Sequence, residues 1–66
     1  MNMSRGKLVD KAMLIDVKRV MELLSVPKTR AYEVIKLLNK ELEEHGFLVV
    51  RGRVPEKYLR ERYGID

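Results

Sequence analysis

The side chains best suited to bind a polyanion are concentrated in residues 28–40. Cations open this segment, and a face of hydrogen-bonding groups follows: Lys28, Thr29, Arg30, Tyr32, Glu33, Lys36 and Lys40. Ammonium, guanidinium, hydroxyl and carboxylate groups are those that reach phosphates and the edges of bases. The alternative for these residues is an ordinary solvated surface of mixed charge.

A second basic element follows at Arg51-Gly52-Arg53. Two arginines at the tip of a two-stranded ribbon can flank phosphates or enter a minor groove. Basic hairpin tips are common, so these two arginines indicate DNA binding only if a helix-turn-helix precedes them.

Catalytic and metal chemistry find little support in the sequence. The chain has no cysteine and one histidine, which excludes thiolate metal sites and gives no zinc site. No nucleophile–base pair or phosphate loop is visible, and 66 residues leave no room for an ordinary enclosed active site. We therefore expect no enzyme, no cofactor and no metal. Glu41, Glu43 and Glu44 are interpreted as a solvated face, and His45 as a helix-end residue.

The charge balance favours a polyanionic partner. Fourteen Lys and Arg face ten Asp and Glu, and the sequence pI is about 9.6. Many small proteins are basic without a specific reason, which is the alternative. The longest apolar runs have four residues, too few to cross a membrane, so we expect no membrane partner and a cytoplasmic location.

Hydrophobic periodicity predicts the elements that position these groups. Val17, Val20, Met21 and Leu24 form one face of a helix over 16–24, with Asp16 as its N-cap. A second helix is expected over 27–45, with Pro27 in its first turn and an apolar stripe at Ala31, Val34, Ile35, Leu38 and Leu42. Gly46 suits the position after its end.

The rest of the chain predicts a hairpin and a last helix. Residues 47–54 have strand propensity on both sides of Arg51-Gly52, and a helix over 55–63 would bury Tyr58, Leu59 and Tyr63. Residues 13–15 are expected to add a short strand. We interpret residues 1–12 as a flexible basic N-terminal arm and residues 13–66 as one domain.

The segment 17–36 fits a helix-turn-helix, in which two short helices are locked by a tight turn. Apolar residues stand at the offsets this lock requires: Val17, Val20, Leu24, Val26, Ala31 and Val34. Two positions depart from the usual pattern. Met21 replaces a small residue, and Ser25 replaces the turn glycine, where it needs a strained backbone or a different turn. A generic helical hairpin is the alternative.

From Leu14 to Arg62 the chain resembles the excisionase-type, MerR-like winged helix-turn-helix proteins of phages and integrative elements. The matching stretches are LIDVKRVMELLSV, PKTRAYEVIK, FLVVRGRV and PEKYLRERY. The resemblance implies a mainly helical α+β fold of three helices with a β-hairpin wing. It also implies binding of double-stranded DNA and an integrase or recombinase partner. Self-association on DNA is a separate expectation. The second helix is longer here than in many relatives.

Carried over by position, the resemblance assigns a major-groove face to Lys28, Thr29, Tyr32, Glu33 and Lys36, and a wing to Arg51 and Arg53. With Arg30 and Lys40 these form the nine predicted contact residues. The leading hypothesis is sequence-specific DNA binding, either by an excisionase-like architectural factor or by a small transcriptional regulator. The competing class is a protein-interaction module, such as a phage antirepressor or adaptor, that uses the acidic end of the second helix.

Overall fold

The computed structural model describes residues 13–66, so the predicted arm at 1–12 lies outside the described residues. Within that range the order of elements is β1 (Leu14–Ile15), α2 (Val17–Leu24), α3 (Lys28–Glu44), β2 (Val54–Pro55) and α4 (Glu56–Tyr63). The domain is therefore mainly helical α+β, with three described helices and a two-stranded antiparallel sheet. None of the described helices has the length and apolar character needed to cross a membrane.

The helix predictions are confirmed to within one residue at each end. Asp16 is the N-cap of α2, and its carboxylate accepts from the Arg19 amide at 3.2 Å. Pro27 precedes α3, and Gly46 follows it with φ of 88°. The amide of Phe47 donates to Leu42 O at 2.9 Å and closes the end of this helix.

The predicted β-hairpin at 47–54 is wrong. Residues 47–53, called here the α3–β2 loop, contain no strand, and the β2 strand pairs with β1 instead. Ile15 lies opposite Val54 in this antiparallel pair. The predicted strand at 13–15 thus exists as β1. It pairs with β2, the segment that was expected to form the second strand of the hairpin.

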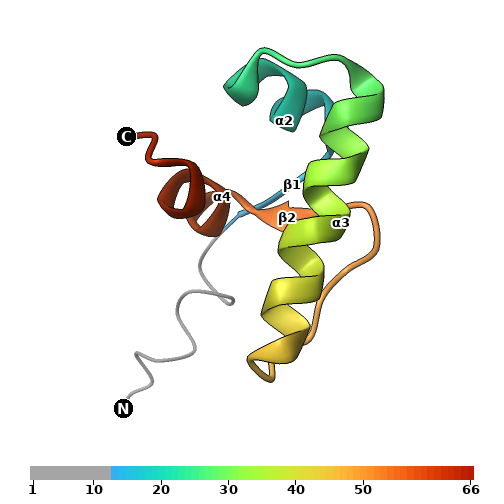
Figure 1. Ribbon diagram of the computed structural model, residues 1–66, viewed down its shortest axis with the longest axis vertical. Coiled ribbons are helices and arrows are strands. Elements are labelled where there is room, and N and C mark those ends of the chain that lie inside the picture. The colour runs from blue at the N-terminus through green and yellow to red at the C-terminus, as the bar shows by residue number, and fades with distance from the viewer. Residues whose placement is uncertain (1–12) are drawn as a thin grey trace.

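The core lies where α2, α3, α4 and the two strands meet. One cluster contains the buried side chains Ile15, Val20, Ala31, Val34, Ile35, Leu38, Val54 and Leu59. Figure 1 shows α2 and α4 on one side of α3 and the α3–β2 loop on the other. Leu59 is fully buried as expected, Tyr58 is partly buried, and Tyr63 is 43% exposed, so its predicted core position is wrong.

The turn between α2 and α3 contains a strained serine. Ser25 has φ of 56° and ψ of 49°, the left-handed conformation that glycine adopts at least cost. Its amide and that of Val26 both donate to Met21 O, the second at 3.3 Å. Ser25 therefore adopts the left-handed backbone conformation that the glycine of the usual motif would adopt at this position.

Ser25→Gly is expected to raise the free energy of unfolding by about 0.5–1 kcal/mol. The gain is the relief of left-handed strain less the larger chain entropy of glycine in the unfolded state. For a domain of this size the melting temperature should rise by about 2–8 °C. Ser25→Val is the matched control, because a β-branched residue tolerates this conformation poorly and should lower the melting temperature. An unchanged or lower value for Ser25→Gly would contradict the strain.

Candidate nucleic-acid interface

All nine predicted contact residues lie on the surface. Each is exposed, on the outer face of α3 or on the α3–β2 loop: Lys28, Thr29, Arg30, Tyr32, Glu33, Lys36, Lys40, Arg51 and Arg53. The apolar stripe of α3 faces the core, so the helix presents its polar face outward. This exposure leaves their side chains free to meet a ligand.

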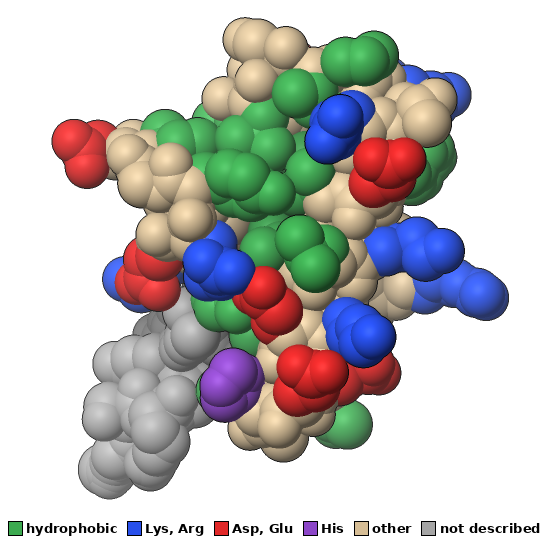
Figure 2. Space-filling model, viewed as in Figure 1, with side chains coloured by type: hydrophobic (Ala, Val, Ile, Leu, Met, Phe, Trp, Pro, Cys, Tyr) green, Lys and Arg blue, Asp and Glu red, His purple; other side chains and the backbone are tan. Residues whose placement is uncertain are grey.

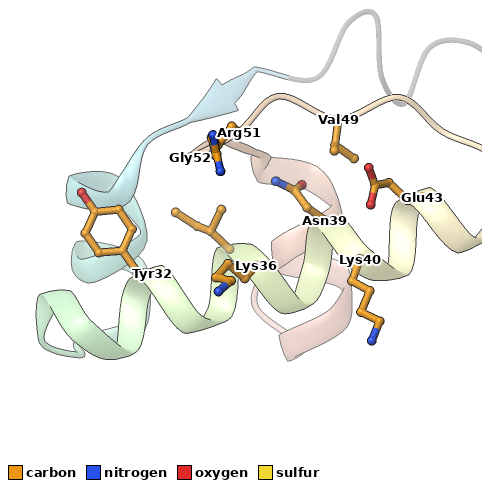
Figure 3. Close-up of a pocket in the computed structure, with 9 residues that line it drawn as sticks. Tyr32, Lys36, Asn39, Lys40, Glu43, Val49, Arg51 and Gly52 are labelled. Atoms are coloured by element: carbon orange, nitrogen blue, oxygen red, sulfur yellow. The ribbon is translucent and has the colours of Figure 1, made fainter.

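An open groove between α3 and the α3–β2 loop brings four of the nine together. Tyr32, Lys36 and Lys40 line it from the helix, and Arg51 lines it from the loop. Figure 3 shows Asn39 pointing from the helix toward the loop and Lys40 pointing away from it. The groove lining thus combines three cations and a phenol with one carboxylate, that of Glu43. Its net charge is positive, which suits an anionic backbone.

The other α3 residues lie outside the groove, toward the N-terminal end of the helix. Arg30 Nε and Glu33 Oε1 are 3.7 Å apart, and both side chains are about two-thirds exposed. Such a pair is weak and easily exchanged for another partner. The N-cap of α3 is Pro27, which gives no side-chain cap to the first-turn amides. This end therefore carries the positive pole of the helix next to Lys28.

Arg53 does not line the groove. It borders a small cavity on the other side of the loop, together with Leu42 and Leu48. Leu48 is 92% exposed, although strand propensity placed it in the hairpin. The loop thus presents its two arginines to different surroundings, and only Arg51 shares the groove with α3.

The charge along α3 is uneven. Figure 2 shows acidic side chains toward the C-terminal end of α3 and cationic side chains along the side of the helix that carries the loop. Glu43 and Glu44 are exposed, as predicted. A polyanion is therefore attracted to the N-terminal part and the loop side of α3, and repelled at its far end.

The interpretation of Glu41 as part of a solvated face is wrong. Its carboxylate accepts hydrogen bonds from Tyr58 Oη at 2.7 Å and from Arg62 Nε and Nη2 at 2.7 and 2.6 Å. These bonds, that from Arg62 foremost, lower the pKa of Glu41 to about 2. Glu41 thus fastens α4 to α3. Its partners stand 17 and 21 residues away, so no local pattern could have indicated them.

The depressed pKa of Glu41 predicts acid sensitivity. A carboxylate with a lowered folded-state pKa stabilises the fold above the unfolded pKa, near 4.5, and this stabilisation is lost as the pH falls toward about 2. Glu41→Gln should flatten the dependence of melting temperature on pH in that window. Glu44→Gln, which removes the same charge from the exposed surface of α3, should leave it almost unchanged. Identical pH profiles for the two variants would contradict the assignment.

Asn39 is the functional candidate that the sequence interpretation missed. Its side chain is 8% exposed and donates to Val50 O at 3.2 Å and to Arg53 O at 2.8 Å. It stands between Ile35 and Leu42 on the buried side of α3. A polar residue at an otherwise apolar position was the available signal, because buried polar groups are usually hydrogen-bonded for a reason.

One curated relative matches most of the chain. Over 53 residues, 80% of this chain and 83% of the relative, 26% of positions are identical to the ICEBs1 excisionase of Bacillus subtilis (strain 168). The chain is a distant homologue of that excisionase. The match agrees with the resemblance to excisionase-type proteins found in the sequence. No family model matches the chain, and no solved structure matches it significantly.

Proposed function

We propose that this protein binds double-stranded DNA as an excisionase-like helix-turn-helix protein that lacks a β-hairpin wing in its described residues. In this proposal α2, the turn at 25–27 and α3 form the helix-turn-helix, and α3 is the recognition helix. The α3–β2 loop takes the place of the hairpin wing. The observation that carries the proposal is the groove in which Arg51 from the loop joins Tyr32 and the lysines of α3.

The nine contact residues divide by the part of the duplex that each reaches. Thr29, Tyr32, Glu33 and Lys36 are assigned to base edges in the major groove, because they lie on the exposed face of α3. Lys28, Arg30, Lys40, Arg51 and Arg53 are assigned to phosphates, which fix orientation rather than sequence. The excisionase homology favours a role in recombination. An integrase or recombinase as partner and self-association on the DNA are further parts of the proposal.

A mobility-shift experiment tests the proposal. The full chain is titrated onto duplexes that tile the DNA flanking its own gene, with a scrambled duplex as competitor. One flanking duplex should stay bound in excess competitor. No shift at low salt, or equal competition by scrambled DNA, would contradict sequence-specific binding.

Salt should weaken this binding steeply. Five cations are assigned to phosphates and should neutralise them: Lys28, Arg30, Lys40, Arg51 and Arg53. The logarithm of affinity should then fall against the logarithm of salt with a slope of about −4 to −5. Fluorescence anisotropy over a series of salt concentrations measures this slope. An affinity that does not change between low and physiological salt would contradict a phosphate-bound complex.

A protein-interaction module is the second candidate function. The observation that favours it is exposed apolar surface, with Leu37 51% and Tyr63 43% exposed. Figure 2 shows hydrophobic side chains gathered between α2, α3 and α4. The sequence hypothesis placed the partner at the acidic end of α3. Glu41 at that end already binds Arg62 of α4, so its carboxylate is not available to a partner. A module of this kind predicts no salt-sensitive duplex binding, so the salt series distinguishes the two functions.

A further inference from the structure

The α3–β2 loop has no strand to hold it in place, yet it carries both wing arginines. The backbone bond within the loop runs from the Arg53 amide to Val50 O at 3.1 Å. Gly52, with φ of 78°, takes the positive-φ position of this four-residue turn, as in type II turns. That bond shapes the turn but does not fix it against α3.

Asn39 supplies the attachment to α3. Its amide nitrogen donates to Val50 O and to Arg53 O, the first and last residues of the turn. The tip residues Arg51 and Gly52 lie between these two anchored carbonyls. Both amide protons of one side chain are therefore used to hold both ends of one turn.

Asn39 is the polar exception among the buried residues of α3. The Oδ1 atom of Asn39 is buried and accepts no hydrogen bond from the described residues. A buried acceptor without a partner is costly, whereas an apolar side chain of similar shape would avoid that cost. The neighbouring buried positions on α3 are apolar, including Ile35, Leu38 and Leu42. Leucine would therefore fit the surroundings but would not donate to the loop.

We infer that Asn39 is a positioning residue for DNA binding, because it fixes Arg51 and Arg53 relative to the recognition face of α3. This inference rests on the proposed function. Asn39 borders the groove but is 8% exposed, and both of its amide protons are used on the loop, so no contact of its own with the duplex is assigned to it. It acts on backbone carbonyls, so the position of the turn at 50–53 on α3 depends on this amide.

The test uses two substitutions at position 39 whose side chains are close in size to asparagine. Asn39→Leu removes the donors and the unpaired acceptor, so the domain should keep its fold. Asn39→Asp keeps the shape but places acceptors against two carbonyls. Affinity is measured for the flanking duplex bound in the mobility shift and for a scrambled duplex of equal length. Asn39→Leu should weaken both by the factor seen for Arg51→Ala/Arg53→Ala, with a salt slope shallower by about 2. Asn39→Asp should bind the two duplexes no more tightly than Asn39→Leu does.

A double-mutant cycle makes the result decisive. If Asn39 acts through the arginines, Arg51→Ala/Arg53→Ala should have little further effect on affinity in the Asn39→Leu background. Hydrogen exchange of the amides of residues 50–53 in the free chain should be faster in Asn39→Leu than in the parent. A folded Asn39→Leu protein with parental affinity, or with effects that add to those of the arginine variants, would overturn the inference.

Failure of this inference is distinguishable from failure of the proposed function. A parent chain that binds neither duplex at low salt overturns the proposed function, and the DNA role of Asn39 with it. A parent that binds DNA while Asn39→Leu binds equally well overturns the positioning role alone. Unchanged hydrogen exchange in the loop of Asn39→Leu would also overturn it, independently of any DNA.

Discussion

Replacing Leu59 with alanine is expected to lower the free energy of unfolding by about 2–5 kcal/mol. Leu59 is fully buried in the core cluster, and it is the buried side chain through which α4 joins that core. A chain of 66 residues can build only a small core, so a loss of this size removes much of its stability. Urea denaturation followed by far-UV circular dichroism measures the change.

Leu37→Ala is the matched control for the core prediction. It makes the same chemical change on α3 at a side chain that is 51% exposed, and it should alter stability by less than about 0.5 kcal/mol. The two leucines are therefore expected to differ several-fold in their effect. Equal losses for Leu59→Ala and Leu37→Ala would contradict the packing of α4 described here.

Glu33→Ala is expected to reduce discrimination between cognate and scrambled DNA by about 1–3 kcal/mol. A carboxylate near phosphates weakens non-specific binding, and it is tolerated where it accepts from a cytosine amino group or orients a cation. The loss of discrimination follows from the first role, in which a base contact is lost. The Arg30–Glu33 pair at 3.7 Å is exposed and weak, so it leaves Glu33 able to make that contact. The measured quantity is the ratio of the two affinities at one fixed salt concentration.

Arg51→Ala and Arg53→Ala serve as controls for Glu33→Ala. Phosphate contacts carry little sequence information, so each should weaken cognate and scrambled duplexes by similar factors. If the arginine variants alone lost discrimination while Glu33→Ala retained it, the reading element would lie in the loop rather than in α3.

The helices could be predicted from the sequence because their signals are local. Asp16 and Gly46 mark a start and an end, and the apolar stripe of α3 recurs with the helical period. The strand partners could not be predicted in the same way. Strand propensity in residues 47–50 indicated a hairpin, but a strand also needs a partner, and Val54 pairs with Ile15 from the start of the domain.

The candidate site was predicted as a list of exposed residues, but its assembly was not. Helical periodicity places Tyr32 and Lys36 on the outer face of α3, and the structure agrees. The groove that adds Arg51 depends on how the α3–β2 loop lies against the helix. That placement rests on Asn39, whose hydrogen bonds span 11 and 14 residues and have no local pattern.

Chemical-shift mapping on the DNA complex tests the central claim most directly. The full ¹⁵N-labelled chain is titrated with the flanking duplex bound in the mobility shift, and the amide shifts of residues 13–66 are followed. The largest changes are expected at residues 28–36 and 50–53, with small changes in α4. Changes concentrated in α4 and around Leu37, with residues 28–36 unaffected, would contradict DNA recognition by the outer face of α3.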